Sequence, residues 1–309
     1  MRSIDVPYFL VREPGPLTLV EDLGRPGHAA LGVPPSGALD APALKLANRL
    51  VGNPEGAAGL EIAFGHLIGE FSDGRWFAVT GADLDARLHE TPLTPNVPYY
   101  AAPGQVLRMR GRRGRGVRAY LAISGGIEVP AALGSRSADL MSGLGPAPLC
   151  RDRRLPLGRP SGRLPGVDVA PVGAIVESPT LEIVPGPRDD WFTPDALELL
   201  TGSPYTVTAD ANRIGIRLAG PVLPRSRTAE LPSEGMVTGG LQVPPSGQPI
   251  LLLSDHPTTG GYPVIAVVTS ASLPLAAQLA PGDTVRFHRV PRLEPRRADR
   301  RKEEGFPSG

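Results

Sequence analysis

Polar side chains that could do chemistry gather in residues 239–263, "GGLQVPPSGQPILLLSDHPTTGGYP". The apolar run "ILLLS" predicts a strand, and the loop after it carries Asp255, Thr258, Thr259 and Tyr262 beside two glycines. A glycine-bounded loop at the end of a rigid strand lets a substrate approach hydroxyl groups and backbone N–H groups together. The alternative is a capped hairpin, in which Thr and Asp side chains bond only the local backbone.

A second stretch of this kind, residues 21–40, reads "EDLGRPGHAALGVPPSGALD". Arg25 lies between two glycines, and its guanidinium could hold a carboxylate or a phosphate through two parallel hydrogen bonds. A salt bridge from Arg25 to Asp22 or Glu21 is the alternative. Asp40 is better suited to cap a helix than to act as a catalytic acid.

The word VPPSG occurs in both stretches, at residues 33–37 and 243–247. Its two prolines fix two φ angles, and its glycine frees the position after them, so each copy predicts a rigid corner. The repeat indicates two related lobes that use the same corner.

Three further charged residues could face a substrate in a cleft. Glu61 in "GLEIA" and Asp83 in "TGADL" each lie at the end of a predicted strand. There a carboxylate could face a substrate or could simply be solvated. Arg213 in "DANRIGIRL" could neutralise an anionic substrate, with surface ion pairing as the alternative.

Composition and missing motifs exclude several classes of function. A net charge of +1 argues against a general binder of nucleic acid or membrane surfaces. The six arginines of residues 108–118 lack interleaved aromatics, which favours a solvated hairpin tip over an RNA site. The five histidines have no ligand spacing, so no metal site is expected. Neither Lys45 nor Lys302 follows a glycine, so no phosphate loop is present and no cofactor is predicted from the chain's own motifs.

Cysteine usage and hydropathy indicate a cytoplasmic protein with no membrane segment. The only cysteine is Cys150, and neither a long apolar leader nor an 18-residue apolar run is present.

The chain reads as short strands separated by turns, because it has 38 Gly and 37 Pro among 309 residues. Many short strands separated by turns are typical of a β-barrel or a β-sandwich. A first helix is predicted over residues 40–54, with Asp40 as its cap and Pro42 in its first turn. A second helix is predicted with Thr193 as its cap and Pro194 at its first position.

Domain boundaries follow from the distribution of these elements. Residues 1–158 are predicted to form a first lobe and residues 181–290 a second one. Residues 159–180, rich in Pro and Gly, form the linker between them. The tail over residues 291–309 has almost no apolar side chains and is predicted to be disordered.

Several longer words occur in a characteristic order over most of the chain. They are "PGPLTLVEDLGRPGHAALGVPPSGALD", "ANRLVGNPEGAAGLEI", "TGAD", "RAYLAISGGIEVPAALGSRS", "GLQVPPSGQPILLLSD" and "PTTGGYPVIAVV". Together they resemble the biotin-dependent carboxyltransferase-like family. That family includes the C subunit of bacterial 5-oxoprolinase, the carboxyltransferase part of urea carboxylase, allophanate hydrolase subunit 2-like proteins and an antagonist of a sporulation-kinase inhibitor.

The resemblance implies a mainly β fold of two cyclophilin-like β-barrel lobes with a few short helices, facing each other across a cleft. Each VPPSG would then be the equivalent corner of its own lobe. The implied activity is the ATP-dependent conversion of 5-oxo-L-proline to L-glutamate, carried out with partner subunits of the A and B types. Such a lactam hydrolase subunit, similar to carboxyltransferases, would be active only in the complex.

Two other functions stay open. One is a carboxyltransferase that acts on urea or a similar amide, with biotin carried by a partner. The other is a binding protein, without catalysis, for a kinase inhibitor. In either case ATP and biotin belong to the complex and not to this chain.

The resemblance also implies roles for individual residues. The catalytic set is Asp255, Thr258, Thr259 and Tyr262, which would polarise the amide oxygen and relay a proton. The set predicted to bind substrate is Arg25, Ser36, Asp40, Glu61, Asp83, Arg213 and Gln242. Two positions depart from the family's words: Glu21 stands for the Gln of "TTVQDLGR", and Pro257 stands for the Gln of "DxQTTGGYP".

Overall fold

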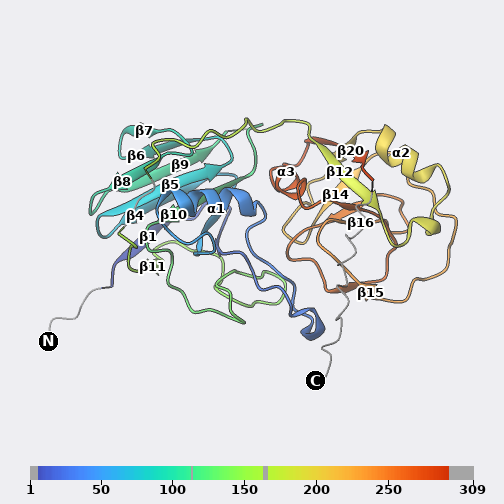
Figure 1. Ribbon diagram of the computed structural model, residues 1–309, viewed down its shortest axis with the longest axis horizontal. Coiled ribbons are helices and arrows are strands. Elements are labelled where there is room, and N and C mark those ends of the chain that lie inside the picture. The colour runs from blue at the N-terminus through green and yellow to red at the C-terminus, as the bar shows by residue number, and fades with distance from the viewer. Residues whose placement is uncertain (1–5, 113, 163–165, 292–309) are drawn as a thin grey trace, which may run out of the picture.

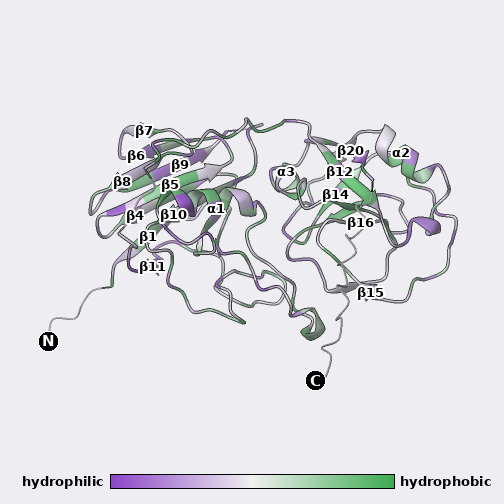
Figure 2. Ribbon diagram, in the orientation of Figure 1, coloured by the Kyte–Doolittle hydropathy of each residue, from purple (hydrophilic) through white to green (hydrophobic). Residues whose placement is uncertain are grey.

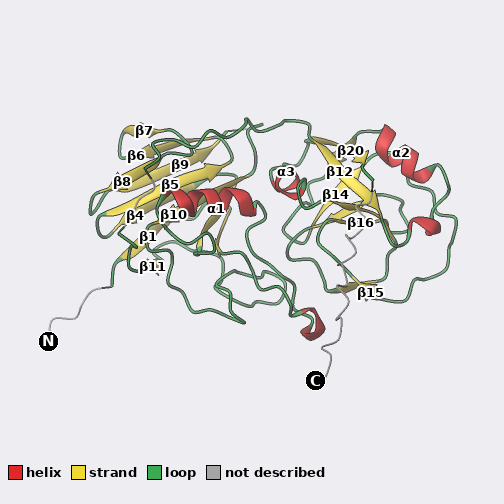
Figure 3. Ribbon diagram, in the orientation of Figure 1, coloured by secondary structure: helices red, strands yellow, loops and turns green. Residues whose placement is uncertain are grey.

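The computed structural model describes residues 6–112, 114–162 and 166–291, and the predicted tail lies outside them except for Pro291. Two β-rich lobes lie side by side (Figures 1 and 3). The described α-helices are α1 (Ala41–Leu50), α2 (Ala196–Gly202) and α3 (Leu273–Ala277), and the 3₁₀ turns are η1 (Ala29–Leu31) and η2 (Asp189–Trp191). The prediction of a mainly β fold with two barrel-like lobes and a few short helices is confirmed.

Two sheets face each other in the N-terminal lobe. The first has the order β11 (Arg154–Pro156), β1 (Tyr8–Glu13), β4 (Leu67–Phe71), β9 (Val106–Gly111), β6 (Leu84–Leu88) and β7 (Thr91–Leu93). The second has the order β2 (Leu17–Glu21), β3 (Gly59–Ala63), β10 (Arg118–Ile123), β5 (Arg75–Gly81) and β8 (Pro98–Ala101). Alternate apolar residues of both sheets meet in one core. At its centre the ring of Phe71 lies 5.1 Å from those of Phe9 and Phe77.

Helix α1 covers the outer face of the second sheet. Asp40 caps it by accepting a hydrogen bond from the backbone N–H of Ala43 at 3.1 Å, and Pro42 lies in the first turn, as predicted. On the buried side of the helix, Ala47 and Leu50 pack against small residues of β5 and β10.

The C-terminal lobe is a closed barrel. Its strands follow the order β12 (Thr180–Pro185), β19 (Val264–Val268), β16 (Gly240–Gln242), β17 (Ile250–Leu252), β14 (Gly215–Ala219), β13 (Tyr205–Val207) and β20 (Thr284–Arg289). The last strand pairs with β12 in parallel, which closes the ring. Green, apolar stretches lie on β5 of the first lobe and β12 of the second (Figure 2). Outside the barrel, β15 (Glu234–Gly235) pairs with β18 (Thr259–Gly260) to form a small ribbon.

The prediction that the two VPPSG copies are equivalent corners is wrong. The second copy is the hairpin loop between β16 and β17, and Gly247 donates to Pro244 O inside that loop. The first copy leads from η1 towards α1, and its Ser36 N–H donates to Ser254 O of the other lobe at 3.0 Å. One copy therefore lies at the junction of the lobes, whereas the other serves its own barrel.

The second predicted helix begins later than expected. Helix α2 starts at Ala196 after Asp195, and the Thr193 hydroxyl donates to Pro224 O at 3.4 Å instead of capping the helix. The Thr193 hydroxyl, which the local sequence predicted to cap the helix, thus bonds to a residue 31 positions away. The predicted boundaries of the two lobes and the linker stay a prediction.

A glycine in β4 gives a test of the packing between the sheets. A Cβ atom on Gly69 would lie 2.1 Å from Cζ of the Phe9 ring, at the centre of the core. We expect Gly69→Ala to lower the free energy of unfolding by about 1–3 kcal/mol, because the ring must shift. Urea denaturation measures this change in the free energy of unfolding. Gly202→Ala is the control, since an added Cβ there meets nothing within 4 Å. Equal stabilities of the two variants would contradict the close packing of Phe9 on Gly69.

Candidate functional site

Arg213 is buried between the lobes and bonds to both of them. Its Nε donates to Asp255 Oδ2 at 2.8 Å, within its own lobe. Its Nη1 donates to Glu61 Oε1 at 2.6 Å, and its Nη2 donates to Gly37 O at 2.8 Å, both in the N-terminal lobe. All three charged side chains are at most 3% exposed. One guanidinium therefore fixes strand β3, the first VPPSG corner and the loop after β17 relative to one another.

Two more charges belong to this interlobe network. Glu21 Oε1 lies 3.4 Å from Arg213 Nη2, and Arg118 Nε lies 3.5 Å from Glu61 Oε1. Three carboxylates thus face two guanidinium groups, which leaves one excess negative charge if all of them are ionised. An uncompensated charge in such a buried place is costly, so one carboxyl group is expected to keep its proton.

We expect Glu21 to be the carboxyl group that keeps the proton. Burial raises the pKa of Glu21 well above its ordinary value, and the nearby Glu61 and Asp255 carboxylates add to the effect against the attraction of Arg213. Among the described residues, neither of its oxygens has a hydrogen-bond partner. Burial also raises the pKa of Asp255, but its two hydrogen bonds from Arg213 favour the ionised form. For Glu61 the raising effect of burial is outweighed by Arg213 and Arg118, so its pKa is lowered and it stays ionised.

The network continues from Glu61 to the start of α1. The Tyr120 hydroxyl donates to Glu61 Oε2 at 2.8 Å and accepts a hydrogen bond from the Asp40 N–H at 2.8 Å. Gln278, which follows α3 in the other lobe, donates from Nε2 to Asp40 Oδ2 at 2.8 Å. Its Oε1 accepts the backbone N–H of Arg118 at 3.0 Å. A continuous chain of hydrogen bonds therefore joins Arg213 to Asp40 across the interface.

Arg25 lies at the first VPPSG corner and contacts only neutral groups. It donates to Ala132 O at 3.2 Å, to the Ser36 hydroxyl at 3.3 Å and to Ser137 O. The predicted alternative of a salt bridge to Asp22 or Glu21 is wrong, because Asp22 instead accepts from Ser135 at 2.6 Å and from other donors. Arg25 is 2% exposed, and its positive charge is not paired with a carboxylate among the described residues.

The predicted catalytic loop continues from this junction into the β15–β18 ribbon. Thr258 O accepts the Met236 N–H at 2.9 Å, and Thr259 pairs with Gly235. Thr259 and Tyr262 are exposed, and Gln242 holds the loop by donating to Tyr262 O at 3.4 Å. In Figure 1, η1 and β15 lie on the same lower side of the molecule. The side chains of Thr259 and Tyr262 are open to solvent, and that of Thr258 is half-buried.

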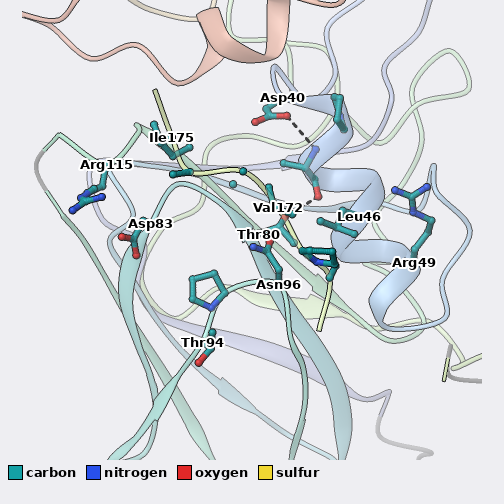
Figure 4. Close-up of a pocket in the computed structure, with 18 residues that line it drawn as sticks. Asp40, Leu46, Arg49, Thr80, Asp83, Thr94, Asn96, Arg115, Val172 and Ile175 are labelled. Carbon is teal, nitrogen blue, oxygen red and sulfur yellow. Dashed lines mark hydrogen bonds between the residues drawn. The ribbon is translucent and has the colours of Figure 1, made fainter. Parts of the chain in front are cut away.

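A separate cavity of about 590 Å³ lies in the N-terminal lobe, between α1 and the turn from β5 to β6 (Figure 4). Asp40 and Asp83, both predicted to bind substrate, line it. Burial raises the pKa of Asp40 despite its hydrogen bonds from Gln278 and Ala43. Asp83 is a strand-end residue as predicted, and its carboxylate lies 3.5 Å from Arg112 Nη1.

The predicted site residues thus fall into four places instead of one. Arg213, Asp255 and Glu61 form the buried network, although Glu61 was expected at a strand end and lies in the middle of β3. The corner holds Arg25 and Ser36, the ribbon and its support hold Thr258, Thr259, Tyr262 and Gln242, and the cavity holds Asp40 and Asp83. Their roles towards a substrate stay a prediction.

Sequence reasoning missed Arg118, Tyr120 and Gln278 as parts of the network. Arg118 was assigned to the solvated basic patch of residues 108–118. Its separation from the other arginines by Gly116 and Val117 was the only local sign that it belongs elsewhere. Within the described residues, no group of three His, Cys, Asp or Glu side chains could hold a metal ion. No helix in that part of the chain is long and apolar enough to cross a membrane.

Comparison with protein families shows what this chain is similar to. The model of the carboxyltransferase domain, subdomain A and B, matches residues 31–289. The C subunit of 5-oxoprolinase from Escherichia coli (strain K12) is 39% identical over 276 residues, which are 88% of this chain and 88% of that protein. The C subunit of 5-oxoprolinase from Haemophilus influenzae is 32% identical, and the match covers 92% of both chains. Urea amidolyase of Lachancea kluyveri is 31% identical over 90% of this chain but 17% of that protein.

Solved structures with the same fold include two larger proteins. TTHA0988 superposes with a TM-score of 0.85 and 38% identity over 93% of this chain. The Kluyveromyces lactis urea carboxylase superposes with a TM-score of 0.83 and 30% identity over 93% of this chain. The chain spans 57% of TTHA0988 and 28% of the urea carboxylase, so it corresponds to one region of each.

The protonated Glu21 predicts a pH dependence of stability. In the unfolded chain Glu21 ionises near its ordinary pKa of 4.5, whereas in the folded chain it keeps its proton to higher pH. The folded state therefore binds more protons in that window, and stability falls as pH rises through it. Glu21→Gln, which has the same shape and no titration, should remove this slope, up to about 1.4 kcal/mol per pH unit. Urea denaturation of both proteins between pH 4 and 9 measures it; parallel profiles would contradict a protonated Glu21.

Proposed function

Because the chain belongs to the family of the carboxyltransferase domain, subdomain A and B, we propose that it is the C subunit of a 5-oxoprolinase. In this proposal it acts with partner subunits of the A and B types to convert 5-oxo-L-proline to L-glutamate with consumption of ATP. The family match confirms the resemblance read from the motifs.

One observation carries this proposal. The similarity to the C subunit of 5-oxoprolinase from Escherichia coli extends over 88% of each chain, at 39% identity. By contrast, the match to urea amidolyase of Lachancea kluyveri covers only 17% of that protein. The proposal therefore follows the relatives that correspond to this chain over most of their length.

Opening a lactam needs activation of a resonance-stabilised amide. In our proposal the hydroxyl groups of Thr258 and Thr259 and the backbone N–H groups near Gly260 polarise the lactam oxygen. Tyr262 lies exposed in the same loop and is the candidate for proton transfer. Asp255 is 0% exposed and bonded to Arg213, so we assign it the task of anchoring the loop rather than contact with the substrate.

The substrate carboxylate needs a positive group with charge to spare. Arg213 is already paired with the Glu61 and Asp255 carboxylates and lies beside the Glu21 carboxyl group, whereas the partners of Arg25 are all neutral. By charge, Arg25 is therefore the better of the two predicted carboxylate binders. Because it is 2% exposed, a substrate carboxylate would have to displace a neutral partner such as the Ser36 hydroxyl. Arg25 and Ser36 both lie at the corner that contacts the loop of Asp255 through the Ser36–Ser254 hydrogen bond.

ATP belongs to the partner subunits in this proposal. Phosphate loops use a Lys that follows a Gly, and Lys45 lies inside α1, where its Nζ is 3.8 Å from Glu55. The residues present do not fit such a loop, and no step on this chain is assigned to the nucleotide.

A second candidate function is a carboxyltransferase that uses biotin held by a partner and acts on urea or a similar amide. The TM-score of 0.83 to the Kluyveromyces lactis urea carboxylase favours it. The third reading, a binding protein for a kinase inhibitor without catalysis, rests on the altered loop in which Pro257 replaces the family's Gln.

Reconstitution distinguishes these functions. The full chain is purified with candidate A and B subunits and assayed for glutamate formed from 5-oxoproline and ATP. Our proposal expects glutamate only when all subunits and ATP are present. Carboxylation of urea with a biotinylated carrier and bicarbonate, without 5-oxoproline turnover, would instead establish the second function.

A substitution in the ribbon tests the assignment of the site. We expect Thr259→Val to lower kcat by about 100-fold to 1,000-fold in the reconstituted complex, because a donor to the developing oxyanion is lost. The free energy of unfolding should change by less than about 0.5 kcal/mol, since the side chain is exposed and Val has the same shape as Thr. Thr206→Val is the control, an exposed Thr on β13 of the C-terminal barrel. Wild-type turnover by Thr259→Val would remove Thr259 from the catalytic set.

A further inference from the structure

We propose that Arg225 is a further substrate-binding residue, which holds the carboxylate that forms at the lactam carbonyl when the ring opens. This inference rests on the proposed function and adds a residue to its site that no motif in the sequence indicated. Arg225 lies between β14 and β15, in the lobe that carries the β15–β18 ribbon.

The product of the proposed reaction carries one more carboxylate than the substrate. Besides the hydrolysis of ATP, ring opening consumes one water. The C–N bond of the lactam breaks, the water oxygen joins the carbonyl carbon, and the nitrogen becomes an ammonium group. The lactam carbonyl thereby becomes the side-chain carboxylate of L-glutamate. Neutral donors such as the Thr259 hydroxyl suit the carbonyl oxygen, whereas a full negative charge is held more strongly by a guanidinium.

Arg225 has a positive charge that no carboxylate in the described part of the chain pairs with. Its Nη2 donates to the backbone oxygen of Val243, and its buried Nε has no hydrogen-bond partner. The residue is partly exposed, and its Nη1, which bonds to no described residue, is not buried as Nε is. Burial lowers the pKa of Arg225, and among the described residues only the phenol of Tyr262 acts in the opposite direction. The guanidinium can therefore offer Nη1 to an anion that arrives from solvent.

Two arginines of neighbouring segments do not share this property. Arg188 Nη2 lies 2.7 Å from Glu234 Oε2. Arg227 Nη2 lies 2.8 Å from Asp190 Oδ2. Both charges are thus neutralised within the chain, whereas a partly buried cation without a carboxylate beside it is stabilised by an anionic ligand. This difference singles out Arg225 on this side of the barrel.

Arg225 is held beside the loop that carries the proposed catalytic groups. Val243, whose oxygen it bonds, directly follows Gln242 in the chain. The Gln242 side chain donates to Tyr262 O at 3.4 Å and lies against Gly260 of the ribbon, where an added Cβ would be 2.6 Å from its Nε2. The electrostatic effect of Tyr262 on Arg225 indicates the same proximity. Arg225 is therefore placed to take up a negative charge that forms on a ligand at the ribbon.

L-Glutamate and L-glutamine isolate the group in question, because they differ only in the side-chain carboxylate and amide. Calorimetric titration of the full chain, alone and in the reconstituted complex, measures both affinities. We expect the wild type to bind glutamate at least about tenfold more tightly than glutamine, as a charge-assisted hydrogen bond allows. Arg225→Gln should remove this preference, since an amide can still bond Val243 O but carries no charge. Arg225→Lys, which keeps the charge, should restore part of it.

Arg227→Gln is the matched control. Arg227 is an exposed arginine two positions away that is paired with Asp190, so its loss should leave the preference for glutamate unchanged. Circular dichroism verifies the fold of each variant.

The kinetics of the complex provide a second readout. 5-Oxoproline has no charge at the lactam carbonyl, so Arg225→Gln should lower kcat at least about tenfold and leave KM nearly unchanged. Arg225→Lys should recover part of kcat. A rise in KM at constant kcat would overturn the inference, because Arg225 would then bind a group that the substrate already carries.

The outcomes separate this inference from the proposed function. Equal affinities of the wild type for glutamate and glutamine, or a preference that survives in folded Arg225→Gln, would overturn the inference even if the complex forms glutamate. A complex that forms no glutamate would refute the proposed function, whereas a preference that is lost with Arg225 would still establish the carboxylate site.

Discussion

The relative position of the two lobes depends on the hydrogen bonds of one buried guanidinium. Arg213 comes from the C-terminal lobe, and two of its three strongest contacts, to Glu61 and to Gly37 O, reach into the other lobe. Removal of one partner from such a buried pair typically costs about 3–5 kcal/mol, a large part of the stability of an ordinary domain. Together with the bonds of Gln278 to Arg118 and Asp40, these directional hydrogen bonds fix how the lobes meet.

This constraint explains the proton on Glu21. The family's words place Gln at this position, and a protonated carboxylic acid has nearly the same shape and polarity as an amide. The network thus accepts Glu in place of Gln without an added charge, since burial raises the pKa of Glu21. The same balance of charge leaves Arg213 neutralised and Arg25 not, although both are buried arginines of the junction.

Local features of the fold were predictable from the sequence, and features that depend on distant contacts were not. The cap at Asp40 and the strand before Asp255 follow from neighbouring residues and were predicted. Thr193 was misassigned because Pro224, 31 positions away, takes its hydroxyl. Glu61 was expected at a strand end because nothing near it in the sequence reveals a partner 152 positions later. The identical VPPSG words diverge for the same reason: their surroundings, not their own residues, decide which one reaches the other lobe.

The parallel pairing of β12 with β20 has a consequence for the synthesis of the chain. Thr180 pairs with Arg286, so the first and last strands of the barrel are joined only after more than a hundred residues have followed β12. Until β20 leaves the ribosome, β12 and β13 each keep an open edge, and open edges invite pairing with other chains. The nascent C-terminal lobe is thus exposed to aggregation until its last strand arrives, while every strand of the N-terminal lobe is already available to fold.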